Sequence, residues 1–364
     1  MTSAAETPHP TTVAMSASTT GDRPVAVWLL ICCAMIFAMV VIGGITRLTE
    51  SGLSITEWRP LTGILPPLNE AEWQRVFDLY QRIPEYQLIN RGMTLEEFKG
   101  IFWWEYIHRL WGRLIGVVFA LPFLYFLVRG RIRRPLMPHL VAMFVLGGLQ
   151  GLLGWYMVQS GLSERTDVSQ YRLAAHLAAA FAIYAYIFWI ALTLIRPLPA
   201  AQPDPGAAGL RRHLLAVAGL TGLTLLYGGF VAGLNAGMVY NTFPLMNGRL
   251  LPDGPLFLEP VWINLFENPG TVQFIHRVLA IALVSTTLWL WVRARAVALA
   301  GHAGVALTLL TGMVLIQASL GIATLLLVVP IPLAAAHQAG AVVVLTLILW
   351  ALHELRAAGR PAAP

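Results

Sequence analysis

The stretch Glu105-Tyr-Ile-His108-Arg109 recurs later in the chain as Gln273-Phe-Ile-His276-Arg277, and this repeat decides how the fold is organised. Three further matches keep the same order: Gly43-Gly44 with Gly228-Gly229, Gln150-Gly-Leu-Leu-Gly154 with Gln317-Ala-Ser-Leu-Gly321, and Leu173-Ala-Ala-His176 with Ala334-Ala-Ala-His337. The spacing between the two members of a pair changes only with the lengths of the loops. The pattern therefore predicts two similar halves in parallel topology.

The composition predicts that both halves lie in a membrane. Of the 364 residues, 57% are hydrophobic and only 12% are charged, and the mean hydropathy is +0.68. Apolar runs of about 20 residues, the length that a helix needs to cross a bilayer, recur along the chain. We therefore expect an all-α integral membrane protein with eight transmembrane helices, arranged as two pseudo-symmetric four-helix bundles. The expected helices span residues 25–46, 106–128, 139–159, 173–195, 213–234, 272–292, 303–328 and 333–352.

Arginines in the short loops predict the orientation. They cluster at 129–134, at 196–212 and at 293–295, which all fall on one side of the membrane. The positive-inside rule makes that side the cytoplasm, with both termini there and the long loops 47–105 and 235–271 in the periplasm. The same rule explains much of the net charge of +6, so no nucleic-acid partner is expected.

The predicted organisation along the chain has five parts. These are a disordered cytoplasmic tail (1–23), an N-terminal four-helix half (24–195), a cytoplasmic linker (196–212), a C-terminal four-helix half (213–354) and a second cytoplasmic tail (355–364). The only cysteines, Cys32 and Cys33, are adjacent in the first helix and point apart, so no disulfide is expected.

The repeat places His108, His176, His276 and His337 at the starts of helices 2, 4, 6 and 8, near the periplasmic surface. Histidine within a membrane span tends to be functional, and two imidazoles from facing helices are a common way to hold haem iron. We therefore pair His108 with His176 and His276 with His337 as axial ligands. The alternatives are polar residues tolerated at the interface and, less favourably, zinc sites. A rival set, His139, His213, His302 and His353, lacks matching flanks and is interpreted as interfacial.

The two halves differ beside these histidines. Glu105 lies three residues before His108 and shares its helix face, whereas its counterpart is the neutral Gln273. A carboxylate near a haem edge can accept a proton or stabilise positive charge on a substrate carbon, which makes Glu105 the candidate catalytic residue. The alternative is an acidic residue that is favoured by the dipole at a helix N-terminus.

Arginines near the periplasmic helix ends are candidates for binding haem propionates, because Arg pairs well with carboxylates. They are Arg47, Arg109, Arg113 and Arg172 in the first half and Arg277 in the second. Interfacial snorkelling is the alternative. The tryptophan-rich first periplasmic loop is either a lid or part of an aromatic belt.

The motifs resemble those of haem A synthases of the proteobacterial and mitochondrial type. The resemblance rests on Gly43-Gly-Ile-Thr-Arg-Leu-Thr-Glu-Ser-Gly-Leu-Ser-Ile55, Glu57-Trp-Arg-Pro60, residues 102–113, Gly233-Leu-Asn-Ala-Gly237, Asn241-Thr-Phe-Pro-Leu-Met246 and the segment around His276. It implies an inner-membrane oxidoreductase that converts the C8 methyl group of haem O into the formyl group of haem A for cytochrome c oxidase. It also implies that His276 and His337 hold a haem b cofactor, while the substrate lies near His108 and His176 and Glu105 is essential.

Some bacterial members carry a cysteine pair in the first periplasmic loop, which this chain lacks, so no thiol chemistry is expected there. The resemblance leaves the electron-transfer partner unidentified. Haem O synthase and a second copy of the chain are candidate partners, and membrane lipid surrounds the helices. The competing functions are a di-haem membrane cytochrome that only transfers electrons and a haem carrier.

Overall fold

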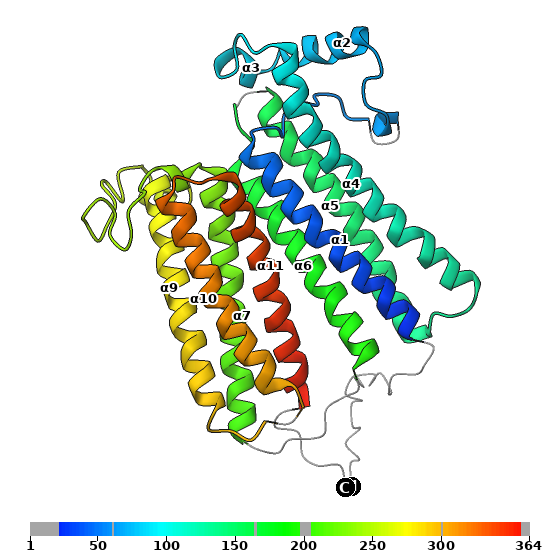
Figure 1. The fold of residues 1–364 in the computed structure, drawn as a ribbon, viewed down its shortest axis with the longest axis vertical. Coiled ribbons are helices and arrows are strands. Elements are labelled where there is room, and N and C mark those ends of the chain that lie inside the picture. The colour runs from blue at the N-terminus through cyan, green and yellow to red at the C-terminus, as the bar shows by residue number, and fades with distance from the viewer. Residues whose placement is uncertain (1–21, 60–61, 164–165, 197–204, 300, 358–364) are drawn as a thin grey trace, which may run out of the picture.

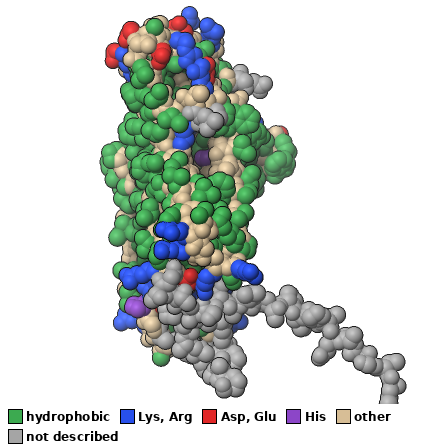
Figure 2. All heavy atoms as spheres, turned by 90° about the vertical axis from the view of Figure 1, so that its right-hand side faces the viewer, with side chains coloured by type: hydrophobic (Ala, Val, Ile, Leu, Met, Phe, Trp, Pro, Cys, Tyr) green, Lys and Arg blue, Asp and Glu red, His purple; other side chains and the backbone are tan. Residues whose placement is uncertain are grey.

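The computed structural model describes residues 22–59, 62–163, 166–196, 205–299 and 301–357. Eight of its helices are long and apolar enough to cross a membrane. They are α1 (Arg23–Leu48), α4 (Leu95–Val128), α5 (Met137–Ser163), α6 (Gln170–Ile195), α7 (Pro205–Gly233), α9 (Pro269–Ala294), α10 (Ala303–Leu326) and α11 (Ile331–Glu354). Their side chains form an apolar belt between two charged ends of the molecule (Figure 2). The all-helical, multi-pass membrane fold with eight spans is confirmed.

The long helices pack in two groups, which Figure 1 shows side by side. In the first group, α1 and α5 each contact both α4 and α6, and in the second, α9 contacts α7 and α10 while α11 contacts α10 and α7. Contacts of α6 with α7, and of α11 with α1 and α6, join the groups. The grouping follows the predicted halves, and the two-fold relation between them stays a prediction.

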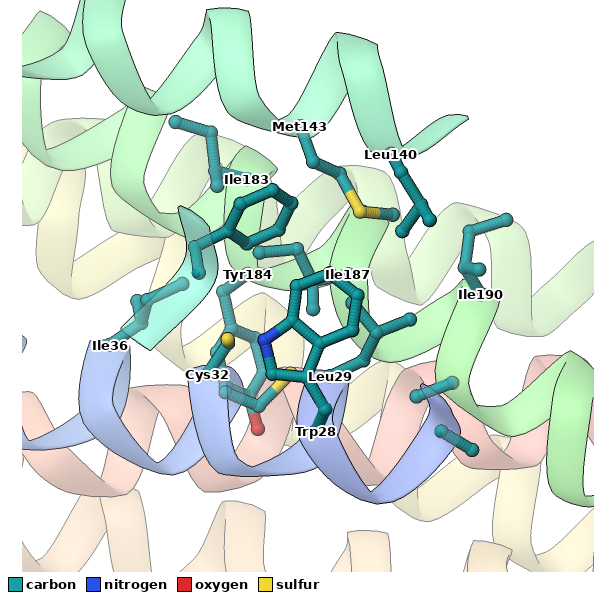
Figure 3. Packing of buried hydrophobic residues seen from close by; sticks show 14 of the residues in the cluster. Trp28, Leu29, Cys32, Ile36, Leu140, Met143, Ile183, Tyr184, Ile187 and Ile190 are labelled. Carbon is teal, nitrogen blue, oxygen red and sulfur yellow. The ribbon is translucent and has the colours of Figure 1, made fainter. Parts of the chain in front are cut away.

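Buried aromatic and aliphatic side chains hold α1 against α4, α5 and α6 (Figure 3). The indole N–H of Trp28 donates a hydrogen bond to the carbonyl oxygen of Val118 at 2.9 Å, and its ring packs against Phe119 and Phe126. Cys32 and Cys33 lie in the same core, and both thiols are free, as predicted. Burial of this apolar surface, together with close packing, stabilises the first group.

Glycines allow α6 and α7 to approach closely where the two groups meet. A Cβ atom on Gly233 would lie 2.7 Å from the Cα atom of Gln170, and one on Gly229 would lie 3.0 Å from the Cα atom of Ala174. Both contacts are to backbone atoms, which have little room to move. Small residues at these positions therefore permit the helix pairing that joins the two groups.

The two long loops lie at one end of the bundle, called here the long-loop end. The first contains η1 (Thr62–Ile64), α2 (Glu70–Tyr80) and α3 (Pro84–Leu88), which pack on the beginning of α4. The second contains η3 (Ala236–Met238), η4 (Val261–Ile263) and α8 (Asn264–Glu267). The remaining short helices, η2 (Arg134–Leu136) and η5 (Leu355–Ala357), lie at the opposite, short-loop end.

Three predicted boundaries were wrong. Helix α4 begins at Leu95 rather than at 106, because Thr94 and Glu97 form a reciprocal capping box that starts the helix before its apolar part. Helix α7 begins at Pro205 rather than at 213, so Arg211 and Arg212 lie within it. Residues Leu355–Ala357 are not a free tail, because Leu355 and Ala357 are buried. Residues 1–21 of the predicted tail 1–23, residues 197–204 of the predicted linker and residues 358–364 lie outside the described residues.

Candidate functional site

The four repeated histidines all lie in the parts of their helices that are nearer to the long-loop end. His176, His276 and His337 lie in the second or third turn of α6, α9 and α11. His108 lies deeper in its helix than predicted, because α4 starts at Leu95. The imidazoles of His108 and His176 are close enough to interact electrostatically, and so are those of His276 and His337. This proximity follows the predicted pairs, and their ligation of iron stays a prediction.

Each of these imidazole rings rests against a glycine on a neighbouring helix. A Cβ atom built on the glycine would approach a ring atom to between 2.8 and 3.4 Å. The contacts are Gly43 with His108, Gly154 with His176, Gly228 with His276 and Gly321 with His337. All four glycines belong to the motifs that repeat between the halves. Glycine at these positions therefore makes room for the imidazoles.

In the second half, backbone oxygens fix the Nδ1 side of both imidazoles. His276 Nδ1 lies 3.2 Å from the carbonyl oxygen of Thr224, and His337 Nδ1 lies 3.2 Å from that of Gln317. The Gln317 amide nitrogen also lies 3.1 Å from His337 Nδ1 and donates to the carbonyl oxygen of His337 at 2.8 Å. At His276 the carbonyl is the hydrogen-bond partner of Nδ1, which favours the tautomer that carries its hydrogen there and leaves Nε2 with a lone pair for a metal.

The first half lacks these carbonyl partners. The amide nitrogen of Gln150 lies 3.2 Å from His176 Nδ1 and donates to the His176 carbonyl oxygen at 2.9 Å. His108 makes no hydrogen bond among the described residues. His108 is therefore less restricted than its counterpart His276. His176, in contrast, shares the glutamine contacts of His337 and lacks only the contact with a carbonyl oxygen.

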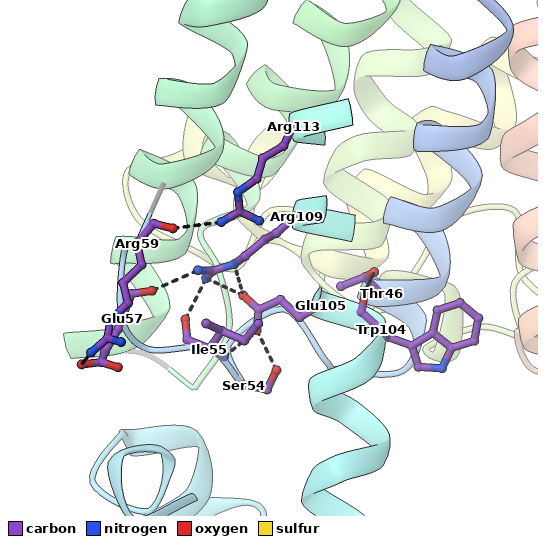
Figure 4. A network of polar contacts seen from close by, with 9 residues as sticks. All are labelled: Thr46, Ser54, Ile55, Glu57, Arg59, Trp104, Glu105, Arg109 and Arg113. Carbon is purple, nitrogen blue, oxygen red and sulfur yellow. Dashed lines mark hydrogen bonds and ion pairs between the residues drawn. The ribbon is translucent and has the colours of Figure 1, made fainter. Parts of the chain in front are cut away.

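Glu105 is 2% exposed, and its carboxylate is surrounded by hydrogen-bond donors (Figure 4). One oxygen, Oε2, accepts from the hydroxyl of Ser54 and from the backbone N–H of Ile55, both at 2.7 Å. The other oxygen, Oε1, accepts from Arg109 Nε at 3.0 Å and Nη2 at 2.6 Å. Because α4 begins at Leu95, the alternative of a carboxylate at a helix N-terminus was wrong.

Gln273 occupies the equivalent place with the opposite hydrogen-bonding pattern. Its side-chain amide donates to the carbonyl oxygens of Ala236 and Tyr240 at 2.8 and 3.3 Å. Its oxygen accepts from Arg277, as Glu105 accepts from Arg109. The loop of the first half thus presents donors to Glu105, whereas the loop of the second half presents acceptors to Gln273.

The five predicted propionate-binding arginines all lie towards the long-loop end and bind protein groups there. Arg109 and Arg277 each donate to two loop carbonyl oxygens. Arg113 donates to the carbonyl oxygen of Arg59, and Arg172 donates to that of Tyr156. Arg47 pairs with Asp167 at 3.2 Å and donates to the carbonyl oxygen of Ala232. Propionate binding by these side chains stays a prediction.

The rival histidines lie at the short-loop end and belong to separate contacts. His139 bonds to Tyr186, and His213 lies beside Arg293. His302 contacts Arg196, whereas His353 is fully buried rather than interfacial. Within the described residues, no three His, Cys, Asp or Glu side chains form a group that could hold a metal ion. A zinc site of that kind is therefore absent from this part of the chain.

The sequence interpretation gave no role to Ser54, Thr224, Gln150 or Gln317. The two glutamines were visible in the repeat, where each precedes a repeated histidine, but the separations of 26 and 20 residues differ between the halves and gave no sign of a partnership. Ser54 and Thr224 carry no sequence signal, because one lies in a loop without a repeated counterpart and the other contributes only its backbone oxygen.

The chain is similar to known proteins along most of its length. Residues 26–349 match the family model COX15-CtaA, described as "Cytochrome oxidase assembly protein". A "Heme A synthase" of Rhodospirillum centenum is 57% identical over 342 residues, which cover 93% of this chain and 90% of that protein. Proteins of the same name from Nitrosospira multiformis and Nitrosomonas eutropha are 53% and 52% identical and are covered to 94% and 95%.

Proposed function

Because this chain belongs to the COX15-CtaA family of cytochrome oxidase assembly proteins, we propose that it is a haem A synthase. Relatives of that name match more than nine-tenths of its length. The proposed reaction oxidises the C8 methyl group of haem O to a formyl group by successive hydroxylations and loss of water. It makes the protein an oxidoreductase of haem biosynthesis, located in the inner membrane.

The difference in hydrogen bonding at Nδ1 carries the assignment of the two halves. In the second half, carbonyl oxygens lie at Nδ1 of both imidazoles, which suits a resident haem b on His276 and His337. The glycines beside the rings make room for the imidazoles that would hold such a group. A bound haem b supplies one-electron oxidation and reduction. In the first half, the less restricted His108 suits a haem O substrate that must bind and leave.

Glu105 supports the reaction as a negatively charged group beside His108. Two carboxylate oxygens offer about four acceptor positions, and four donor contacts already occupy them. The carboxylate is therefore better suited to stabilising charge than to accepting a proton. The arginines at the long-loop end supply positive charge near the expected positions of the propionates.

The proposed partners follow from the substrate. Haem O carries a farnesyl-derived chain and is poorly soluble in water, so direct transfer from haem O synthase within the membrane is favourable. An electron-transfer protein is also required because the reaction is an oxidation. A second copy of the chain is a further candidate partner.

The test is expression in a host that makes haem O but not haem A, followed by extraction, chromatography and mass detection of the haems. We expect haem A, or its hydroxylated intermediate, with the native chain. Glu105→Ala should keep its haem b and lose the oxidised products, whereas His276→Ala should lose haem b from the purified protein.

His302→Ala is the matched control, since His302 is an exposed histidine at the short-loop end. It should behave like the native chain. If the native chain yields only haem b and unmodified haem O, the synthase proposal fails. Two stably bound haems would then favour a di-haem cytochrome, and exchange of unmodified haem between proteins would favour a carrier.

A further inference from the structure

Residues 53–59, called here the strap, follow α1 in the chain and contact both α4 and α5 at the long-loop end. Leu53 lies against Gly161 of α5, where a Cβ atom would be 2.6 Å from the Leu53 side chain. The ring of Trp58 packs against Trp155 of α5 at 6.3 Å between centroids. On the other side, Arg113 of α4 donates to the carbonyl oxygen of Arg59 at 3.0 Å. The strap therefore bridges two helices that contact each other sparsely.

The strap touches immediate neighbours of both imidazoles in the first half. Arg109, which follows His108, donates to the carbonyl oxygens of Ile55 and Glu57 at 2.7 and 3.2 Å. Trp155, which packs on Trp58, follows the glycine that accommodates His176. Figure 2 views the molecule from the right-hand side of Figure 1, where α4 lies. A histidine side chain is visible there in a hollow of the surface. The strap thus contacts the helix turns that carry His108 and Gly154, the glycine beside His176.

A buried carboxylate of α4 accepts hydrogen bonds from the strap, in addition to the bonds that Arg109 and Arg113 donate to the strap. Glu105 accepts one hydrogen bond from the Ser54 side chain and one from the Ile55 backbone (Figure 4). Ser54 itself is 1% exposed. Arg109 ties the same carboxylate to strap carbonyl oxygens, so the attachment is a closed network of charge-assisted bonds. Opening the strap would break several of these bonds together.

The second half shows why the residue at this position is glutamate. Gln273 bonds to loop carbonyl oxygens, which an amide N–H can satisfy and a carboxylate cannot. In the first half the loop presents a hydroxyl and an N–H to the same atom, and a glutamine nitrogen there would face donors. The difference between Glu105 and Gln273 thus matches the polarity of the loop that each residue holds.

We propose that Ser54 is a positioning residue for substrate haem, because it fixes the Glu105 carboxylate and thereby latches the strap across the α4–α5 side of the first-half site. This inference rests on the proposed function for the identity of the haem. With the latch closed, the strap retains haem beside His108 and His176 and keeps the carboxylate in place. Haem exchange then requires the Ser54 and Ile55 bonds to open.

Ser54→Ala in the full-length purified protein tests the latch. In the haem-free protein, we expect the Ile55 amide to exchange with deuterium about tenfold faster, which is the scale of one lost hydrogen bond to a charged group. In protein loaded with haem O, release from the first half to an apoglobin should accelerate by a similar factor. Haem b in the second half should keep its spectrum and its release rate.

Two matched variants separate latching from general damage to the loop. Ser54→Thr keeps the hydroxyl and should restore slow exchange and slow release. Thr56→Ala removes a hydroxyl from the same strap that makes no hydrogen bond among the described residues, and it should behave like the native chain. Equal effects of Ser54→Ala and Thr56→Ala, or native-like exchange and release in Ser54→Ala, would overturn the proposal.

The two proposals fail in different ways. If the native chain does not oxidise haem O, the synthase function fails, but amide exchange at Ile55 still reports on the latch. If the native chain oxidises haem O and Ser54→Ala leaves both exchange and release unchanged, the latch fails and the function stands.

Discussion

At the scale of single residues, the sites depend on glycines, whose lack of a Cβ atom leaves room for the imidazole rings. Each of the four repeated histidines has a glycine beside it, and the tightest of these contacts is between Gly321 and His337. A methyl group at Gly321 would approach the imidazole Cε1 atom to 2.8 Å, closer than real Cβ atoms come to their neighbours. The ring would have to turn away from the position in which Gln317 holds it.

Gly321→Ala should therefore weaken retention of haem in the second half. We expect purified protein with less than about half of the native haem content, because a small-to-large change in a packed site commonly costs about 1–3 kcal/mol. The haem extracted per protein and the optical spectrum of the remainder measure this loss.

Gly312→Ala on the same helix is the control for that variant. A Cβ atom at Gly312 meets nothing within 4 Å. The change should leave haem content intact and stabilise the helix by up to about 1 kcal/mol. Native haem content in both variants would show that the glycine contact does not position His337.

These residue-scale roles were only partly predictable. The repeat identified the four histidines and, in its quoted motifs, all four glycines, but only packing shows which glycine faces which ring. Ser54 could not be assigned, because the loop has no periodic pattern and its partner is 51 positions away in sequence. Long-range contacts of this kind depend on how the helices bring the loop back.

At the scale of elements, predictability followed the apolar runs. The eight spans were predicted because a bilayer requires long apolar helices. Helices α2 and α3 and the first turns of α4 were missed, since they lie outside the membrane and combine charged with apolar residues. Their signals were local: an Asn69 cap on α2, a proline at the start of α3 and the capping box of α4.

Helix α3 contributes a buried acid that should make this loop sensitive to pH. Glu85 is 5% exposed, and burial raises its pKa from 4.5 to about 8, assisted by repulsion from other acidic groups. The acidic groups that act on it are Glu105 on α4, Asp167 before α6 and Glu50 after α1, while Tyr80 on α2 lies beside it and lowers its pKa slightly by a hydrogen bond.

The folded loop therefore keeps a proton on Glu85 that the unfolded chain releases near pH 4.5. Its stability should be greatest below that pH and should fall as the pH rises towards about 8. Glu85→Gln should remove this loss of stability at high pH. It should stabilise the loop at pH 9 by up to about 5 kcal/mol, because each unit of difference between the folded and unfolded pKa corresponds to about 1.4 kcal/mol.

Proteolysis of residues 66–94 in the full-length protein at pH 5, 7 and 9 measures this stability. Glu70→Gln is the control, because the Glu70 side chain is 76% exposed on α2. It should retain the pH dependence of the native chain. A native loop equally resistant at all three pH values would contradict the expected titration of Glu85.

At the scale of the whole molecule, contacts at three levels join the two groups of helices. Arg196 pairs with Glu354 at 2.9 Å at the short-loop end. In the middle, the Gln338 side chain donates to the carbonyl oxygen of Val40 at 2.9 Å. At the long-loop end, Arg47 reaches Ala232. Because Gln338 follows His337, a contact between the groups lies directly beside a proposed iron ligand, and movement of one group is expected to reach the other site.

The predicted orientation of this unit in the membrane rests on the charges of its short loops, and cysteine labelling tests it. The native cysteines are both buried, so single cysteines introduced at exposed positions report accessibility. Leu88→Cys lies on α3 at the long-loop end, where Leu88 is 72% exposed. Arg131→Cys lies in the loop between α4 and α5 at the short-loop end. A membrane-impermeant maleimide on intact cells should label the first at least about tenfold more than the second, because arginine-rich short loops remain in the cytoplasm.

Opening the cells makes the labelling experiment decisive. The cysteine at position 131 should become reactive once the membrane is permeabilised, and the native chain should stay unlabelled throughout. The reverse order, with position 131 labelled in intact cells, would place the arginine-rich loops outside and the histidines near the cytoplasm. The proposed haem sites and the strap would then face the cytoplasm. The orientation therefore determines from which compartment an electron-transfer partner approaches the two sites.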